Sequence, residues 1–132
     1  MRIAVKHLRL VLVLNGASCV LFGLLFLFAP SSVAAFLADR TPAPAAIILV
    51  LGAGLLVNGL ALWFFARSRS PNRRAVQFFS LGDLLWVLAT LVLIGRHVWI
   101  DRSPGILVAL AVAVFVGTVG WLQWRAIAAR AA

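Results

Sequence analysis

The sequence has no tyrosine, no glutamate and only three acidic residues, all aspartates, in 132 residues. Charged residues make up 11% of the chain, whereas a soluble domain averages about 25%. The sequence also shows no paired carboxylates of the kind that acid–base catalysis uses. The composition is therefore that of a membrane protein, and it gives no support to acid–base catalysis by paired carboxylates.

Cysteine is almost absent as well. The one cysteine, Cys19, lies inside an apolar run, so the chain can form neither an intramolecular disulfide nor a cysteine-based zinc site. The two histidines, His7 and His97, are expected on opposite sides of the membrane and cannot share a haem or a metal ion. No glycine-rich phosphate loop occurs, and no serine or cysteine has a histidine within plausible reach. We expect no cofactor and no metal site, and the failure of these templates makes an enzyme the least favoured class.

What the chain does contain is hydrophobic sequence, which accounts for 64% of its residues. It falls into four runs, at roughly 9–29, 45–66, 75–95 and 104–124. Each run has about 20 residues, enough to cross the hydrocarbon core as a helix. The connections are short, which makes consecutive helices antiparallel neighbours. We predict an all-α polytopic membrane protein, with residues 1–132 forming a single four-helix bundle domain.

The loops carry recognisable helix signals. Pro30 ends the first span and precedes a short apolar segment, which we expect to lie as a helical turn or two along the outer interface. Asn72 is placed to cap the third helix, and Ser103 followed by Pro104 is a typical start for the fourth. Trp63 near the end of the second span is expected to anchor that helix at the inner interface.

The basic residues predict the topology. Nine of the twelve lie on one side of the predicted membrane: Arg2, Lys6, Arg9, Arg67, Arg69, Arg73, Arg74, Arg125 and Arg130. The opposite loops hold the other three. By the positive-inside rule both termini are cytoplasmic, and we expect a plasma membrane, the inner membrane of a bacterium. Because the net charge of +9 flanks the apolar runs, its expected partners are the bilayer and anionic lipid headgroups, and not nucleic acid.

Asp83 is the one acidic residue inside an apolar run. On a helix it shares a face with Ser80, Thr90 and His97. A charged side chain at this depth costs about 2.5–3.5 kcal/mol on insertion scales, so Asp83 is expected to face protein or water and not lipid.

Each span also contributes one strongly polar side chain: Asn15, Asn58, Asp83 and Gln123. All four fall in the cytoplasmic half of the membrane, Gln123 close to the interface. One interpretation is an inner polar cavity that binds a proton, a cation or a small ligand, with Asp83, Asn58, Asn15 and Thr90 as its residues. The other is a structural network of interhelical hydrogen bonds, worth about 0.6 kcal/mol each.

Small residues recur every four positions in the fourth span, at Ala109, Ala113 and Gly117, and Gly120 continues the stripe. Such a pattern lets two helices approach closely. It predicts packing inside the bundle, or against a second copy or another membrane protein. In the first span Gly16 and Gly23 form a weaker version of the same pattern.

Three functions remain open from the sequence. The first is transport, permeation or small-ligand binding at Asp83. The second is a non-catalytic accessory or interaction subunit, in which the polar groups serve only packing. The third is a lipid-modifying enzyme. The lone carboxylate within a span favours the first.

Overall fold

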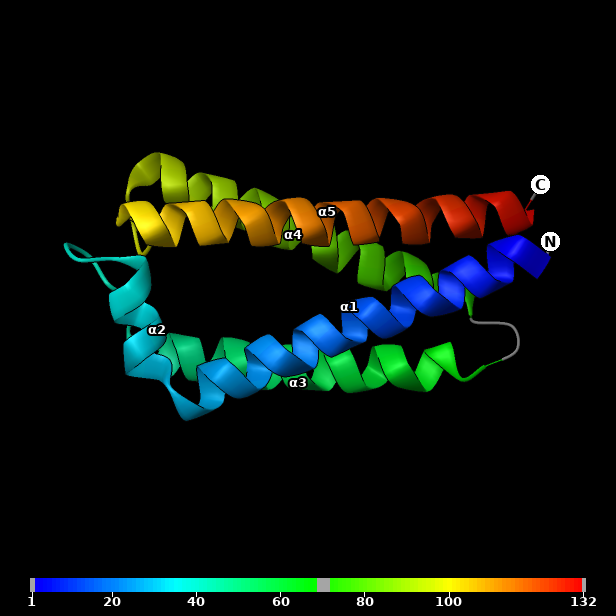
Figure 1. Ribbon diagram of the computed structural model, residues 1–132, viewed down its shortest axis with the longest axis horizontal. Coiled ribbons are helices and arrows are strands. Elements are labelled where there is room, and N and C mark those ends of the chain that lie inside the picture. Colours follow the sequence, from blue (N-terminus) through cyan, green and yellow to red (C-terminus); the bar gives the residue numbers. More distant parts are fainter. Residues whose placement is uncertain (1, 69–71, 132) are drawn as a thin grey trace.

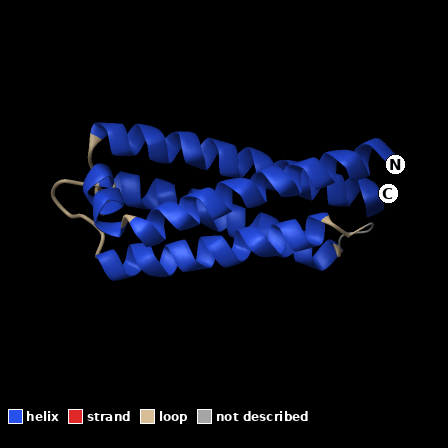
Figure 2. Ribbon diagram, turned by 60° about the horizontal axis from the view of Figure 1, so that its bottom comes forward, coloured by secondary structure: helices blue, strands red, loops and turns tan. Residues whose placement is uncertain are grey.

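The computed structural model describes residues 2–68 and 72–131, and these residues form helices joined by short loops (Figures 1 and 2). The long helices are α1 (Arg2–Phe28), α3 (Ala45–Ala66), α4 (Arg73–Arg96) and α5 (Ser103–Ala131), and a short helix, α2 (Pro30–Leu37), lies in the first loop. Within the described residues four helices are long and apolar enough to cross a membrane. The predicted four-helix membrane bundle with a short helix in its first loop is confirmed.

The helix ends follow the sequence signals. The Asn72 side chain accepts hydrogen bonds from the backbone N–H groups of Arg74, at 2.9 Å, and Ala75, at 3.4 Å, and so caps α4. Helix α5 begins at Ser103, one residue before Pro104, the first helical position that the sequence predicted. Of the predicted basic residues, Arg69 lies outside the described residues, as do the side chains of Arg2, Lys6 and Arg130.

The helices are arranged as two antiparallel hairpins, α1 with α3 and α4 with α5. In the first hairpin the two backbones touch where glycines face each other. A Cβ added to Gly23 would lie 2.8 Å from the backbone nitrogen of Leu56, and one added to Gly59 would lie 2.8 Å from the carbonyl oxygen of Gly16. No side chain fits between these helices at those points, so glycine sets their spacing.

The expectation that all consecutive helices are neighbours is wrong for α3 and α4. The two hairpins pack mainly through α1 and α5, which are far apart in sequence. Between α3 and α4 the clear side-chain contact is that of Phe65 with Phe79, whose ring centroids are 5.8 Å apart. Beyond it the facing positions include Gly54 and Gly82, where an added Cβ would meet nothing within 4 Å. Two glycines offer no side chains to pack, so a short loop alone does not hold these helices together.

The core lies at the end of the bundle that holds both chain termini, called the terminal end below (Figure 1). Buried side chains from all four long helices meet there: Leu8, Leu12, Cys19, Leu62, Ala66, Val76, Phe79 and Ile127. From this core the two hairpins diverge toward the opposite end, the α2 end, so that a wedge opens between them.

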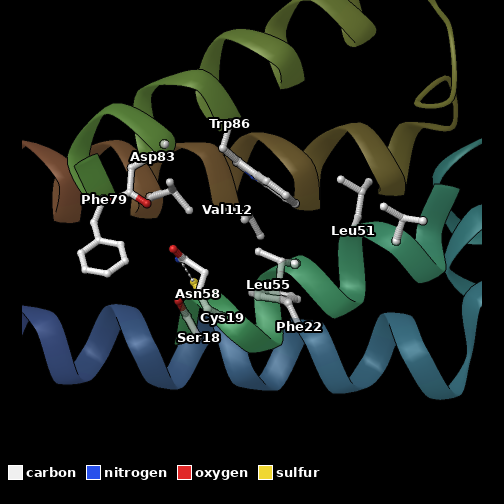
Figure 3. A pocket seen from close by; sticks show the side chains of 14 residues that line it. Ser18, Cys19, Phe22, Leu51, Leu55, Asn58, Phe79, Asp83, Trp86 and Val112 are labelled. Atoms are coloured by element: carbon white, nitrogen blue, oxygen red, sulfur yellow. Dashed lines mark hydrogen bonds between the residues drawn. The ribbon is translucent and has the colours of Figure 1, made fainter. Parts of the chain in front are cut away.

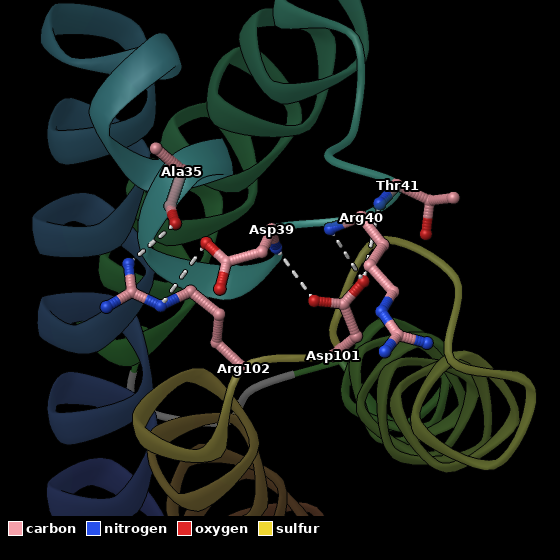
Figure 4. A network of polar contacts seen from close by, with 6 residues as sticks. All are labelled: Ala35, Asp39, Arg40, Thr41, Asp101 and Arg102. Atoms are coloured by element: carbon pink, nitrogen blue, oxygen red, sulfur yellow. Dashed lines mark hydrogen bonds and ion pairs between the residues drawn. The ribbon is translucent and has the colours of Figure 1, made fainter.

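A polar latch joins the hairpins again at the α2 end (Figure 4). The Asp101 carboxylate accepts hydrogen bonds from the backbone N–H groups of Asp39, Arg40 and Thr41, at 2.7, 3.2 and 3.3 Å. The Arg102 guanidinium donates to the carbonyl oxygen of Ala35, at 3.0 Å. The hydrogen bond from the Asp39 N–H, together with those from Thr41 and Arg40, lowers the pKa of Asp101 below its usual value.

Most of each span faces outward. Only 22–28% of the residues in the spans are buried inside the protein, and the exposed positions include large apolar side chains such as Leu85, Val57 and Val114. This surface suits a protein surrounded by lipid on all sides.

Candidate functional site

A buried cluster of polar side chains joins the two hairpins just beyond the terminal core. The Asn15 amide nitrogen on α1 donates to Asp83 Oδ2 on α4, at 3.1 Å, and to Gln123 Oε1 on α5, at 2.7 Å. The Gln123 amide nitrogen donates to Ser80 Oγ, at 3.2 Å, and to Asp83 Oδ2, at 3.4 Å. Three helices are thus linked by four hydrogen bonds around one carboxylate.

The cluster reaches the fourth long helix through sulfur. The Cys19 thiol donates to Asn15 Oδ1, at 3.6 Å, and the Asn58 amide nitrogen on α3 donates to Cys19 Sγ, at 3.4 Å. The strongly polar residues of all four spans therefore belong to one connected network. Its link to α3 is its weakest, because sulfur is a poor hydrogen-bond acceptor.

Close packing of α4 on α5 positions Asp83. A Cβ added to Gly120 would lie 3.0 Å from Asp83 Cβ, so a small residue on α5 makes room for the carboxylate between the two helices. Ser80 stands one turn before Asp83 on the same face of α4, where it meets Gln123. Asp83 and Ser80 are each only 6% exposed.

An apolar cavity of about 250 Å³ lies beside the network, between the hairpins (Figure 3). Its polar lining residues are Ser18, Cys19, Asn58 and Asp83, and a carboxylate oxygen of Asp83 and the amide oxygen of Asn58 point into it. The remaining lining residues are Phe22, Val50, Leu51, Gly54, Leu55, Phe79, Gly82, Trp86, Val112 and Val116. We call this space the first cavity.

A second cavity of about 420 Å³ continues toward the α2 end. It shares Phe22, Trp86 and Val112 with the first cavity, so these three side chains lie at the border between the two. Helix α2 contributes Ser32, Val33, Phe36 and Leu37 to its wall. Together the two cavities occupy the wedge between the hairpins.

Asp83 also borders the opposite face of its hairpin. A groove between α4 and α5, lined by Ser80, Asp83, Gly117, Gly120, Trp121, Trp124 and three aliphatic side chains, runs along the outer surface. Trp121 is 62% exposed there. The carboxylate thus lies at the partition between an interior cavity and a surface that faces lipid.

The Asp83 carboxylate has no cationic partner among the described residues. The one ion pair within these residues joins Arg102 and Asp39 at the α2 end, at 3.8 Å, and the two side chains that donate hydrogen bonds to Asp83 are the amides of Asn15 and Gln123, both to Oδ2. Of the side chains that the structure describes, none donates to Asp83 Oδ1. A buried carboxylate without a counter-ion is costly in lipid.

The predicted site residues have different environments. Asn15 and Asp83 are in direct contact, and Asn58 lies across the first cavity from Asp83. Thr90 is separate from them: its hydroxyl donates to the carbonyl oxygen of Trp86, at 2.8 Å, and it lines the second cavity. Asp83, Thr90 and His97 therefore lie in three different places along one face of α4. Asp83 belongs to the polar network, Thr90 lines the second cavity, and His97 is the C-cap of the helix.

The stripe of small residues on α5 is also divided. Gly120 packs directly against Asp83, and Gly117 is 3.5 Å from Val87, measured from an added Cβ. Ala113 is buried, and Ala109 lines the second cavity. Half of the stripe thus serves the contact of α5 with α4, and its first member, Ala109, lines a cavity.

Sequence reasoning missed or misplaced several parts of the site. Gln123, expected near the membrane surface, is fully buried at 0% exposure and donates to two neighbours. Its burial could have been inferred from the sequence, because Gln123 is the one strongly polar residue of its span, as Asn15, Asn58 and Asp83 are of theirs. Trp63 donates its indole N–H to the carbonyl oxygen of Val13 on α1, at 3.1 Å, so it ties the first hairpin together. Trp86, which separates the two cavities, gave no signal in the sequence.

Within the part of the chain that the structure describes, no group of three or more His, Cys, Asp or Glu side chains is placed to hold a metal ion. Compared with known proteins, the chain matches no family model, and neither a curated protein nor a solved structure is significantly similar to it. Its function must therefore be argued from the site itself.

Proposed function

We propose that this protein binds small amphipathic molecules with a cationic amine group, and that it acts on them as a small transport or permeation protein of the membrane. The apolar part of such a molecule occupies the first cavity, and its ammonium group meets the free oxygen of Asp83 and the amide oxygen of Asn58. Both groups are hydrogen-bond acceptors, which selects for a donor and against an anion.

The observation that carries the proposal is a buried carboxylate at the edge of an apolar cavity, without a cationic partner among the described side chains. Ligand sites are mostly apolar with a few convergent polar groups, and ionisable residues inside a membrane are by default functional candidates. In this proposal the cationic ligand acts as the counter-ion of Asp83.

Access from the bilayer is consistent with this chemistry. Val50 on α3 is 69% exposed and also lines the cavity. Gly54 and Gly82, on facing helices, have open space where side chains would stand. An amphipathic amine dissolved in the membrane can therefore reach Asp83 between α3 and α4 without passing through the core.

The proposal also includes the side of the membrane on which the site lies. Both termini are proposed to be cytoplasmic in a plasma membrane, which places the polar network in the cytoplasmic half of the bilayer. Reporter fusions after Ala132 and within residues 96–103 should report opposite sides of the membrane. Reporters found on the same side would refute this topology.

The test of binding uses n-hexylamine in lipid nanodiscs. Trp86 labelled as 5-fluorotryptophan, with its resonance assigned from a Trp86→Phe variant, reports a saturable shift on binding. We expect n-hexylamine to bind about tenfold more tightly than n-hexanol, the effect of one partly buried charge pair. Asp83→Asn should abolish this preference while retaining the fold, because an amide fills nearly the same volume.

The matched control is Thr118→Val. Thr118 is exposed on α5, its hydroxyl donates to the carbonyl oxygen of Val114 in its own helix, at 2.7 Å, and the variant should bind the amine as the wild type does. An Asp83→Asn protein that kept the full preference for the amine would overturn the proposal.

The accessory-subunit interpretation rests on the same network. A carboxylate that accepts two amide hydrogen bonds and joins three helices is also what a purely structural tie requires. That interpretation predicts equal and weak binding of hexylamine and hexanol to wild type and to Asp83→Asn alike, with unchanged or increased stability of the variant.

A further inference from the structure

We propose that the ligand is a single-chain lipophilic amine whose hydrocarbon tail passes Trp86 and occupies the second cavity, so that this cavity selects ligands by chain length. The proposal rests on the proposed function, because it takes the amine group to be held at Asp83. It adds the class of the apolar part and a set of residues that determine specificity.

The two cavities adjoin each other, and a ligand that extended from one into the other would have a polar end and an apolar end. The first cavity carries the carboxylate and the amide, and Phe22, Trp86 and Val112 border both spaces. Along α4 such a ligand would run from Asp83 past Trp86 to Thr90, about 10 Å at the 1.5 Å rise of a helix. The border between the cavities is lined by two aromatic rings and one aliphatic side chain, which suits a hydrocarbon chain and no polar group.

The second cavity has little to offer a second polar group. Its polar lining side chains are Ser32 and Thr90, and the Thr90 hydroxyl already donates to the Trp86 carbonyl oxygen. The other lining residues are aliphatic or aromatic. A ligand with polar groups at both ends would have to leave one of them without a partner in an apolar space, whereas a plain alkyl tail leaves none.

The far end of the second cavity is closed by packed structure. Helix α2 forms the end wall, and the start of α5 fits tightly against it, since a Cβ added to Gly105 would lie 2.7 Å from the Leu37 Cα. The Leu37 carbonyl oxygen accepts the backbone N–H groups of Asp101 and Arg102, at 3.0 and 3.1 Å. The end wall is therefore held by backbone contacts, whereas the sides of the cavity are partly open, since the lining residues Leu25 and Val108 are 49% and 45% exposed.

The occupant follows from the surroundings. The wedge lies within the hydrocarbon region, where water is excluded and every unfilled space loses packing contacts. Transfer of a tail from lipid to this cavity brings no hydrophobic gain, because lipid tails are as apolar as the cavity wall. Selection must therefore come from fit, so a side chain that fills the second cavity should exclude long tails and leave short ones unaffected.

The experiment compares n-hexylamine and n-dodecylamine by the Trp86 fluorine signal in nanodiscs, with affinities expressed per mole of lipid. Ala109 lines the second cavity and not the first, so Ala109→Phe should weaken dodecylamine about tenfold and leave hexylamine within about twofold of wild type. Leu107→Phe is the matched control, because Leu107 is 68% exposed toward lipid on the same helix. It should change neither affinity. Ala109→Leu gives a milder version of the block if the phenylalanine impairs folding.

If wild type binds hexylamine but Ala109→Phe and Ala109→Leu weaken dodecylamine no more than hexylamine, the tail does not enter the second cavity and this proposal fails while the proposed function stands. If wild type shows no saturable binding of hexylamine, both proposals fail. The two failures are therefore distinguishable in one set of titrations.

Discussion

The two hairpins meet along two seams, α1 against α5 and α3 against α4, and these seams differ in how tightly they are packed. On one side α1 and α5 are in contact, and the Asn15 amide donates to Gln123 across them at 2.7 Å. On the other side α3 and α4 meet through Phe65 and Phe79, and beyond these rings glycines leave open space. The closed seam holds Asp83 by hydrogen bonds, and in the proposed function the open seam is the route from the bilayer to it. A rigid polar network and an accessible cavity are thus combined in one small bundle.

The two seams should differ most in the stability that is lost when one asparagine beside each of them is replaced. Asn15→Leu removes the donor to Asp83 and Gln123 at the closed seam, and we expect a loss of about 2–3 kcal/mol in unfolding free energy because both acceptors stay buried. Asn58→Leu, beside the open seam, removes only the hydrogen bond to Cys19, and should cost less than about 1 kcal/mol. Reversible unfolding in mixed micelles measures both. Equal losses would mean that the two seams are equally tight.

Two faces of α3 provide the next comparison. Gly59 faces α1, where an added Cβ would lie 2.7–2.9 Å from Val20 and Gly16, whereas Gly54 faces the open seam with nothing within 4 Å. Gly59→Ala should therefore destabilise the protein by about 2 kcal/mol through overpacking. Gly54→Ala, the same chemical change on the same helix, should stay within about 0.5 kcal/mol of wild type. A Gly54 variant as unstable as the Gly59 variant would show that α3 and α4 pack together after all.

The smallest effect is expected at the latch that holds the α2 end of the wedge. Because backbone hydrogen bonds lower the pKa of Asp101 in the folded state, its contribution to stability is present above the usual aspartate pKa and is lost as the pH falls through the lowered value. Hydrogen exchange should show Asp39, Arg40 and Thr41 amides protected at neutral pH, with protection lost only in strong acid or in Asp101→Asn.

The control for the latch is Asp39→Asn. The Asp39 side chain is 76% exposed and lies 3.8 Å from Arg102, so its charge should matter little. Exchange of the same three amides should be unchanged in this variant. Equal deprotection by the two substitutions would assign the latch to general charge effects and not to the Asp101 hydrogen bonds.

Periodicity and length predicted the fold well, because both depend on local sequence. Four apolar runs of sufficient length, the cap at Asn72 and the start at Ser103 specify the helices and their ends. Which helices touch depends on shape instead. Gly52 and Gly59 on α3 have the same seven-residue spacing as Gly16 and Gly23 on α1, and only the structure shows that these positions face each other.

Only part of the site could be predicted from the sequence. A carboxylate in an apolar span must find partners, so Asp83 and an amide on a neighbouring helix were expected together. Burial of Gln123 could not be predicted from its position near a helix end, because α5 continues to Ala131 and carries that residue inward of its own terminus. The role of Trp86 depends on the divergence of the hairpins, which leaves no periodic mark in the sequence.

The most direct test of the central claim is a distance. Only three aspartates occur in the chain, so protein labelled with ¹³C at the aspartate carboxyl gives few signals, and Asp83→Asn identifies one of them. Solid-state NMR of the labelled protein in lipid, saturated with ¹⁵N-labelled n-hexylamine, should show dephasing of the Asp83 signal for a nitrogen within about 4 Å, the separation of an ion pair. The signals of Asp39 and Asp101 should be unaffected. An Asp83 signal without dephasing at saturating amine would contradict the account, since the carboxylate would then serve the helix network alone.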